Sequence, residues 1–264
     1  MTSPLSAFII TRDEEARIGR TLTALQNLTD DIVMVDSGST DATVAIARSL
    51  GARVIHRAWN GYGGQKRFAE QQCRHDWVLN VDADEVVTPA LTAEIRKLLA
   101  GNPPPGAYNI NIPTVYPGDS RPRPWPRDVN VVRLYHRAVG SYRDHPSYDR
   151  VEAPGLEPAQ LAAPLWHYPV VDWTGHIDKL NRFSSFQASL PYRYSDRMLK
   201  LRLVGEFPIN FFKTYIGRRH FTGGWKGFYF SLSQAFMRTS RIAKILEARE
   251  RAAERAAGSG KGKP

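Results

Sequence analysis

The length, composition and charge of the chain bound its class. With 264 residues, 42% of them apolar and 11% aromatic, it can bury a sizeable core and does not resemble a disordered chain. Its single cysteine, Cys73, excludes an internal disulfide framework and a multi-cysteine zinc site. The first residues lack the basic region of a secretory signal, and no stretch reaches the roughly 18 apolar residues of a membrane span. These features predict a soluble or peripheral cytosolic protein.

The net charge of +10 is concentrated near the C-terminus. Residues 1–190 contain 20 Lys and Arg against 21 Asp and Glu, whereas residues 191–264 contain 16 against 5. The same last quarter interleaves its cations with aromatic residues, as in "FPINFFKTYIGRRHFTGGWKGFYF". Such a surface suits an anionic partner, either nucleic acid or an anionic lipid leaflet. A solvated basic face on ordinary helices is the simpler alternative.

The first hundred residues alternate strand-like and helix-like patterns. Nearly continuous apolar runs predict buried parallel strands at residues 5–10, 31–35, 52–56 and 76–81. Helical patterns follow the first three runs, at residues 14–28, from a cap at Ser39 or Thr40 to Gly51, and at about 64–73. This order predicts an α/β fold with a doubly wound, mostly parallel sheet.

The pattern changes beyond residue 100. A segment rich in Pro and Gly ends a helix there, and the chain up to about residue 165 predicts further strands and loops. The last third is mostly helical, and its Gly and Lys tail from about residue 257 is expected to be disordered. The expected organisation is a domain over residues 1–190, with halves at about 1–100 and 101–190, and a helical, basic C-terminal region over 191–264.

The segment "VLNVDADE" places Asp82, Asp84 and Glu85 at the end of a buried strand. Uncompensated carboxylates repel one another and are costly to desolvate, so either they lie in water or a positive charge lies between them. Ligands of open parallel sheets bind beyond the carboxyl ends of the strands. The polar residues that follow the strands are Thr11, Glu14, Asp36, Ser37, Lys66, Asp82 and Asp84. Mg²⁺ or Mn²⁺, bound together with a diphosphate, would supply the missing charge.

Four segments carry a resemblance to a known family. The chain resembles the inverting family-2 glycosyltransferases in "FIITRDEEARIGRTLTAL", "DIVMVDSGSTDATVAIARSLGARVI", "GYGGQKRFA" and "WVLNVDADEVV". A looser likeness favours the bacterial subgroup that adds a sugar, often glucose, to the inner core of lipopolysaccharide. It lies in "RLYHRAVGSYRDHPSYDRVE", "LWHYPVVDWTGHIDKLNRFS" and "FFKTYIGRRHFTGGWKGFYF". The resemblance implies a glycosyltransferase-A fold, in which the first hundred residues bind a nucleotide diphosphate sugar and residues 101–190 form the acceptor half.

The resemblance also implies roles for the residues at the first two strand ends. It matches Asp36 to the aspartate that contacts the nucleobase. It matches Thr11 and Glu14 to the loop that lines the nucleoside. Taken by itself, Asp36 is more simply interpreted as a loop or cap residue.

Further roles concern the diphosphate. In the family the first aspartate of the D-x-D pair, here Asp82, typically meets the ribose, and the last, here Asp84, coordinates the metal that bridges the diphosphate. Lys66 and Arg67 lie where the subgroup places a basic group near the nucleotide.

Inversion at the anomeric carbon needs a carboxylate that removes the proton of the acceptor hydroxyl. The subgroup places this base in a His-Glu pair, which Tyr148 and Asp149 match here. Asp149 is therefore the predicted catalytic base, although the histidine is missing and the side chain is shorter. Asp144 and His145 are rivals because they lie close in the sequence.

The remaining histidines and aromatic residues have simpler interpretations. His136, His167 and His176 match no metal-binding spacing, so structural roles are expected. Trp173, Trp225 and the aromatic residues around 207–230 are expected in a core or at a membrane surface. A stacking platform for an acceptor sugar is the alternative.

Together these observations predict a metal-dependent inverting glycosyltransferase that acts on a lipid-linked saccharide of the cell envelope, with the lipopolysaccharide inner core as its target. Residues 191–264 are expected to contact the anionic inner face of the cytoplasmic membrane. No nucleic-acid partner is expected, because the strand-end carboxylates repel phosphate without a metal. A sugar nucleotidyltransferase and a basic binding protein without catalysis remain the alternatives.

Overall fold

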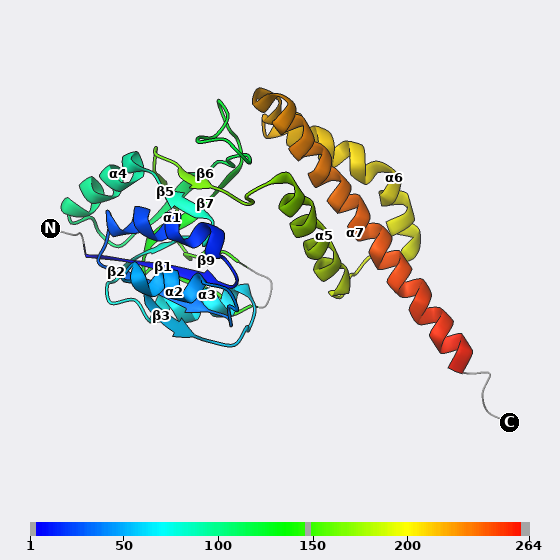
Figure 1. Cartoon of the computed structure of the whole chain (residues 1–264), viewed down its shortest axis with the longest axis horizontal. Helices are drawn as coiled ribbons and strands as arrows, with labels where there is room; N and C mark the ends of the chain where they lie inside the picture. Colours follow the sequence, from blue (N-terminus) through cyan, green and yellow to red (C-terminus); the bar gives the residue numbers. More distant parts are fainter. Residues whose placement is uncertain (1–3, 146–148, 260–264) are drawn as a thin grey trace. The chain divides into compact units, whose positions relative to one another are not determined.

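The computed structural model describes residues 4–145 and 149–259 (Figure 1). The chain divides into two compact units, which we call the sheet unit and the helical unit. The sheet unit contains the chain up to Val115, residues 119–122 and residues 128–169. The helical unit contains residues 116–118, residues 123–127 and the chain from Val170 onward.

The sheet unit is built on a seven-stranded mixed sheet with the order β10-β6-β7-β4-β1-β2-β3. Its strands are β1 (Leu5–Thr11), β2 (Asp31–Asp36), β3 (Arg53–His56), β4 (Trp77–Asn80), β6 (Ala107–Ile112), β7 (Val129–His136) and β10 (Ala159–Gln160). Strands β1 to β4 are parallel where they pair, whereas β7 runs antiparallel to both β4 and β6. The expectation of a mostly parallel α/β sheet is therefore confirmed.

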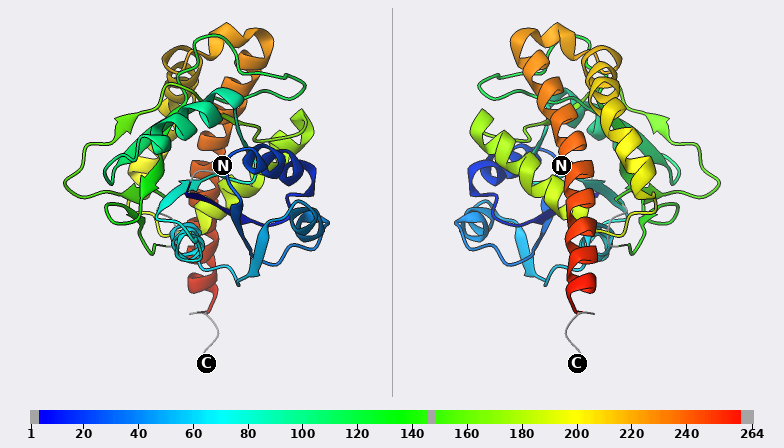
Figure 2. Two further views of the ribbon diagram at one scale, coloured as in Figure 1. Left: turned by 90° about the vertical axis from the view of Figure 1, so that its left-hand side faces the viewer. Right: turned by 90° about the vertical axis from the view of Figure 1, so that its right-hand side faces the viewer.

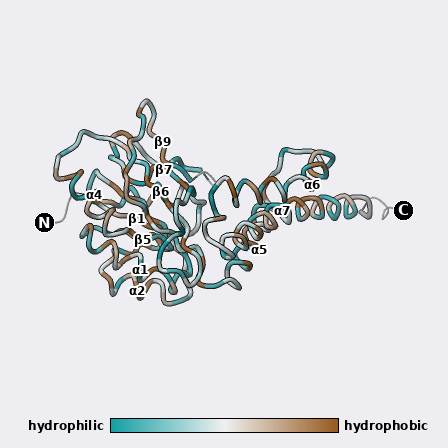
Figure 3. Tube along the Cα trace, turned by 90° about the horizontal axis from the view of Figure 1, so that it is seen from above, coloured by the Kyte–Doolittle hydropathy of each residue, from teal (hydrophilic) through white to brown (hydrophobic). Residues whose placement is uncertain are grey.

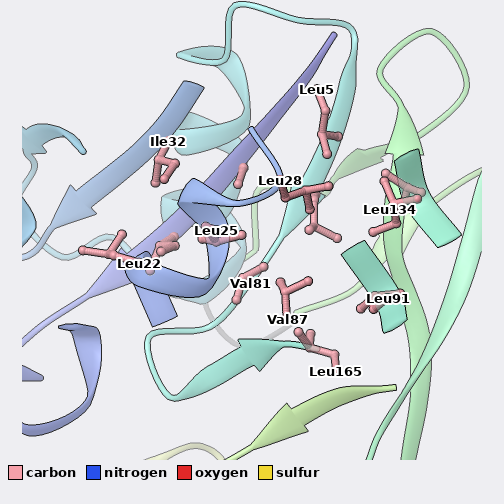
Figure 4. Packing of buried hydrophobic residues seen from close by; sticks show 14 of the residues in the cluster. Leu5, Leu22, Leu25, Leu28, Ile32, Val81, Val87, Leu91, Leu134 and Leu165 are labelled. Carbon is pink, nitrogen blue, oxygen red and sulfur yellow. The ribbon is translucent and has the colours of Figure 1, made fainter. Parts of the chain in front are cut away.

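Helices cover both faces of this sheet because each strand directs alternate side chains to opposite faces. On β1, Leu5 and Ile9 belong to the larger core cluster, together with residues of α1 (Glu15–Gln26) and α4 (Pro89–Ala100) (Figure 4). Phe8 belongs to a second cluster with residues of α3 (Tyr62–Gln71). Strands buried on both faces need continuous apolar runs, which is what the sequence has at these positions.

The predicted elements of the first hundred residues are confirmed with shifts of a few residues at their ends. One detail was wrong: neither Ser39 nor Thr40 caps α2 (Thr43–Ser49). The Asp41 carboxylate instead accepts hydrogen bonds from the backbone N–H and the hydroxyl of Thr43, at 3.0 and 2.5 Å. The helix ends before Gly51 as expected, since Gly51 has a φ of +79°, which suits glycine.

Two small antiparallel ribbons lie beside the main sheet. Strand β5 (Glu85–Val87) pairs with β11 (Leu165–His167), so Glu85, the last residue of "DADE", lies opposite His167. Strand β8 (Ser141–Tyr142) pairs with β9 (Val151–Glu152). These ribbons bring the middle of the chain to the residues that follow β4.

The helical unit consists mainly of α5 (Trp173–Ser189), α6 (Asp196–Phe212) and α7 (Gly224–Ser259). Helices α5 and α6 pack on different sides of α7 (Figure 2). A π-helical turn, η1 (Lys213–Gly217), and a 3₁₀ turn, η2 (His220–Gly223), connect α6 to α7. Gly227 is required at the start of α7, because a Cβ there would lie 1.8 Å from the His220 carbonyl oxygen.

The limits of the two units differ from the expected organisation. The division falls between Pro169 and Val170, so α5 belongs to the helical unit, whereas the sequence placed it in the domain over residues 1–190. Helix α7 extends to Ser259, so residues 257–259 are helical where disorder was expected. Residues 260–264 lie outside the described part, and the extent of the catalytic domain stays a prediction.

Candidate functional site

The candidate site forms where β4 ends, at the segment that carries Asp82, Asp84 and Glu85. Arg133, from the antiparallel strand β7, lies between two of these carboxylates. One of its terminal nitrogens, Nη2, lies 2.7 Å from Asp82 and 2.7 Å from Glu85, and the other donates to the Asn80 side chain. Arg133 is therefore part of the positive charge that the carboxylates require.

Lys66 supplies the second positive charge. It lies in α3 and is only 1% exposed, and its ammonium lies 2.8 Å from Asp82 and 2.9 Å from Asp149. It also lies over the Tyr142 ring, 5.5 Å from its centroid. One buried cation thus joins the D-x-D segment to the predicted base, whereas the adjacent Arg67 is exposed.

The charges in this cluster shift one another's pKa values. Burial alone would raise the pKa of the Asp82 carboxyl, but the charges of Arg133 and Lys66 outweigh it and hold that pKa well below its usual range. Burial alone would lower the pKa of Lys66, but the charge of Asp82 leads the effects that raise it above its usual range. Burial raises the pKa of Glu85 to about 7, because the charge of Arg133 offsets only part of the desolvation. Glu85 therefore titrates near neutral pH while Asp82 stays ionised.

Asp84 lies in a different environment from Asp82. Its Oδ2 atom is 3.4 Å from Nε2 of His167 on β11 and 3.8 Å from Arg17 on α1. Its side chain is 11% exposed. Antiparallel pairing of β5 with β11 brings His167 to this position, opposite Glu85 in the ribbon.

Thr11 and Asp36 lie at neighbouring strand ends, since the two residues pair across β1 and β2. The Thr11 hydroxyl is buried and has no hydrogen-bond partner among the described residues, so a polar ligand atom could satisfy it. The Asp36 carboxylate accepts hydrogen bonds from the backbone N–H groups of Gly38 and Ser39, at 2.9 and 3.0 Å. Asp36 therefore has the turn-forming role that was the simpler alternative, and the nucleobase contact stays a prediction.

Glu14, predicted to line the nucleoside, is paired with Arg17. Its carboxylate lies 2.7 Å from Nε and 2.5 Å from Nη2 of Arg17, which also approaches Asp84. Ser37 accepts a hydrogen bond from the Gln65 amide at 2.9 Å. The structure thus places Lys66, Asp82 and Asp149 in one cluster and links Glu14 to Asp84 through Arg17.

The three candidate bases lie near the first turns of α3. Asp149 is paired with Lys66, and its side chain is 36% exposed. The backbone carbonyl of His145 accepts a hydrogen bond from the Gly63 N–H at 3.1 Å. The Asp144 carboxylate lies close to Gly64, since a Cβ built on that glycine would be 2.8 Å from it. Tyr148 lies outside the described residues, and the choice of base stays a prediction.

A family comparison decides what kind of protein carries this cluster. Residues 6–154 match the model of the glycosyl transferase family 2. The chain belongs to this family. Its sheet unit has the glycosyltransferase-A fold, with the D-x-D segment at the end of β4. The transferase is thereby favoured over the nucleotidyltransferase and the binding protein that the sequence left open.

The relatives of this glycosyltransferase extend over nearly the whole chain. An uncharacterized glycosyltransferase of Rickettsia typhi is 36% identical over 253 residues, which cover 92% of this chain and 87% of the relative. The lipopolysaccharide core biosynthesis glycosyltransferase LpsC of Rhizobium meliloti is 30% identical over 250 residues, 92% of each chain.

Among solved structures, a glucosyl-3-phosphoglycerate synthase from Mycobacterium tuberculosis, in complex with Mn²⁺, UDP-glucose and phosphoglyceric acid, is similar to part of this glycosyltransferase. The two share 24% identity over 44% of this chain and 45% of the synthase, with a TM-score of 0.34.

The donor set of this glycosyltransferase fits a divalent cation that also binds a diphosphate. Within residues 4–145 and 149–259 no three His, Cys, Asp or Glu side chains are arranged to hold a metal by themselves. Asp84 and His167 provide one oxygen and one nitrogen that lie 3.4 Å apart. Mg²⁺ and Mn²⁺ bound to nucleotides often use one or two protein side chains, with phosphates and water as the other ligands. Asp82 is less suited, because two cations already neutralise its charge.

Sequence reasoning missed Arg133 and His167. A signal for Arg133 existed, since a lone arginine interrupts the apolar run "VNVVRLYH" and a buried arginine requires an anionic partner. His167 was expected to be structural, and nothing in its local sequence distinguishes it from His136, which accepts a hydrogen bond from the Ala138 N–H at 3.2 Å. Only the pairing of β5 with β11 reveals its place.

Proposed function

We propose that this family-2 glycosyltransferase transfers a sugar, with glucose as the first candidate, from a nucleotide diphosphate sugar to a lipid-linked saccharide of the cell envelope, with inversion. The observation that carries the proposal is the division of the D-x-D pair, in which Lys66 and Arg133 neutralise Asp82 while Asp84 lies beside His167. The lipopolysaccharide inner core is the proposed acceptor, and the 30% identity to a lipopolysaccharide core glycosyltransferase supports it.

The donor site would use residues at three strand ends. Thr11 and Asp36 would contact the nucleoside, with Glu14 beside them, and Asp82 would contact the ribose. Asp84 and His167 would hold Mg²⁺ or Mn²⁺, which when bound neutralises the charge that develops on the departing diphosphate. The unsatisfied hydroxyl of Thr11 supports a polar ligand at this edge.

The transfer step would use Asp149 as the base. Its carboxylate takes the proton of the acceptor hydroxyl as the hydroxyl oxygen bonds to the anomeric carbon. The bond from that carbon to the diphosphate breaks in the same step, and the nucleoside diphosphate leaves with the electron pair. Lys66 would act as a positioning residue, because its ion pair holds Asp149 and Asp82 at a fixed separation.

The helical unit would hold the enzyme at the inner face of the cytoplasmic membrane. No helix in the described ranges is both long and apolar enough to cross a bilayer. Helices α6 and α7 expose several large apolar side chains on a strongly basic unit, which supports a peripheral contact.

Calorimetric titration with nucleoside diphosphates and their sugar conjugates, with and without Mn²⁺, tests the donor site. We expect metal-dependent binding of one nucleotide, and a loss of at least tenfold in affinity in Asp84→Asn and His167→Ala. His136→Ala is the matched control and is expected to bind as the wild type does. Equal binding with and without Mn²⁺ would contradict the metal site.

Transfer assays with the bound donor separate the base from its rivals. We expect Asp149→Asn to keep donor binding and to reduce transfer by roughly 10²–10⁴-fold. Asp144→Asn and His145→Gln should keep most of the activity. If Asp144→Asn or His145→Gln abolishes transfer while Asp149→Asn does not, Asp149 is not the base.

A further inference from the structure

A small pocket lies in the helical unit where α6, η1 and α7 meet. Its volume is about 40 Å³, and its lining residues are Asn210, Lys213, Thr214, Arg218, Gln234 and Arg238. Pockets for whole nucleotides or drug-sized ligands are roughly ten times larger, whereas a single water needs about 10–15 Å³ on the same kind of measure. The pocket therefore suits a small polyatomic group.

The lining of the pocket is cationic. Lys213, Arg218 and Arg238 form no ion pair within the described part of the chain, and no carboxylate lines the pocket. The nearby cations differ, because Arg202 and Arg241 lie 2.9 and 3.9 Å from Glu206. The unit thus compensates its other central arginines and leaves these three with unbalanced positive charge.

The electrostatic environment of Arg238 agrees with this account. Its pKa is lowered from the usual value, first by burial and then by the charge of Arg241, with Arg218 adding to the effect. The negative charge of Glu206 offsets only part of this. A bound anion would relieve the repulsion among these cations.

The backbone around the pocket is fixed by hydrogen bonds. The Arg218 carbonyl accepts from the Arg123 guanidinium at 2.8 Å, and the Arg218 N–H donates to the Lys213 carbonyl at 3.1 Å. The π-helical turn η1 brings Lys213 and Thr214 to one side of the pocket, and Gln234 and Arg238 lie one turn apart on α7. Residues that carry guanidinium, ammonium, amide and hydroxyl donors therefore line a space the size of a phosphate group.

Exposed apolar side chains continue from the pocket along the outer face of α6. Phe212 and Ile216, which flank Lys213 and Thr214 in sequence, are both 56% exposed, and Ile209 is 66% exposed. Leu201 and Val204 are 71% and 81% exposed at spacings that repeat the same helical face. Figure 3 shows hydrophobic and hydrophilic segments alternating along α6 and α7. Several large apolar side chains exposed along one face of a helix are unusual in water.

We propose that this pocket binds the phosphate of an anionic membrane lipid while the outer face of α6 lies in the lipid interface. Cations at the level of the headgroups and apolar side chains below them are the two signals that stable peripheral binding needs. The proposal rests on the proposed function in one respect, namely that the acceptor is at the membrane. Free inorganic phosphate is the other ligand that could present a phosphate group to this pocket.

Vesicle flotation of the full chain tests the proposal. The vesicles contain phosphatidylcholine alone or phosphatidylcholine with phosphatidylglycerol. The pocket variant carries Lys213→Gln, Arg218→Gln and Arg238→Gln. The control variant carries Arg197→Gln, Lys200→Gln and Arg255→Gln, which remove the same charge from exposed positions of the same unit outside the pocket.

We expect binding only to the vesicles with phosphatidylglycerol, and an affinity at least tenfold lower for the pocket variant than for the control variant. Ile209→Ser with Phe212→Ser should weaken binding by a similar factor. Equal weakening by the two charge variants would overturn the pocket in favour of diffuse attraction. Calorimetric binding of inorganic phosphate without any vesicle binding would overturn the lipid as its source.

Donor binding measured on the same variants separates this inference from the proposed function. The pocket variant should bind the nucleotide with Mn²⁺ as tightly as the wild type, which also shows that it is folded. If vesicles are not bound but the nucleotide is, the lipid site is wrong and the transferase stands. If vesicles are bound in the expected pattern but no nucleotide is, the lipid site stands and the donor site is wrong.

Discussion

Cations in the sheet unit and in the helical unit have different partners. Lys66 and Arg133 are buried, and each lies 2.7–2.9 Å from two carboxylates. Lys213, Arg218 and Arg238 are accessible to solvent, although the guanidinium of Arg238 is partly desolvated, and they form no ion pair in the part of the helical unit that is described. The sheet unit thus uses its cations to hold strand ends together, whereas the helical unit leaves cations available to a ligand.

The burial of large apolar side chains also differs between the two units. The sheet unit buries its large apolar residues in two clusters, one on each face of the sheet. The buried cluster that joins α6 and α7 contains only Leu199, Ile242, Ile245 and Leu246, while most of the exposed large apolar side chains belong to the helical unit. A unit whose surface is both apolar and cationic suits an interface with lipid better than bulk water.

The largest effect is expected where a buried cation is removed from the sheet unit. Arg133→Met leaves Asp82 and Glu85 with less compensation, and we expect the free energy of unfolding to fall by about 3–5 kcal/mol in urea titrations. Arg137→Met is the control, because its partner Asp76 is 69% exposed, and it should cost less than about 1 kcal/mol. Equal losses would show that Arg133 does not hold the strand ends.

The pH dependence of stability is expected to differ between the units. The pKa of Glu85 is raised from 4.5 to about 7, so the folded state binds the extra proton in this window. Stability should therefore fall as pH rises from about 4.5 to 7, by up to about 3 kcal/mol. Glu85→Gln should remove this loss, which thermal unfolding at several pH values would detect. If stability depends on pH in the same way in the wild type and in Glu85→Gln, Glu85 does not cause the loss.

In the helical unit, stability should instead rise as pH rises. Burial, with a smaller contribution from the charge of Lys179, lowers the pKa of His176 from 6.5 to about 4. The unfolded state then binds the extra proton, so stability is present above about pH 6.5 and is lost as pH falls towards 4, by up to about 3 kcal/mol. His176 Nε2 lies 2.8 Å from the Ser233 hydroxyl oxygen. His176→Gln, which can keep a hydrogen bond to that hydroxyl, should reduce the loss of stability at acid pH. If the loss of stability at acid pH is unchanged in this variant, another group causes that loss.

The smallest expected effect concerns the connection between α6 and α7. Gly227→Ala should destabilise the protein by about 2 kcal/mol, because the new Cβ would lie 1.8 Å from the His220 carbonyl oxygen and the turn must move. Gly205→Ala on α6 is the matched control, since its nearest neighbour, a methyl of Ile209, is 3.4 Å away. The control should be neutral or slightly stabilising. Equal effects in denaturant titrations would show that the turn is not constrained.

Part of the site could be predicted from the sequence because it lies at strand ends. Asp82, Asp84, Asp36 and Thr11 each follow an apolar run, and parallel strands bring their carboxyl ends to one edge. The sequence predicted a metal as a source of the missing positive charge and placed Lys66 at this edge, but it did not reveal that Lys66 and Arg133 together neutralise Asp82. An apolar run predicts a strand but not the strand with which it pairs, so the position of Arg133 beside Asp82 could not be predicted.

The sequence by itself determined the α/β fold, the family and the basic C-terminal region, because apolar periodicity, motif spacing and charge are properties of short segments. Only the tertiary structure decided which charges meet. Arg133 lies 51 residues from Asp82 in the chain, and Lys66 lies 83 residues from Asp149. Strand pairing and helix packing bring such residues within 3 Å, and at that distance burial and Coulomb energy set their charge states.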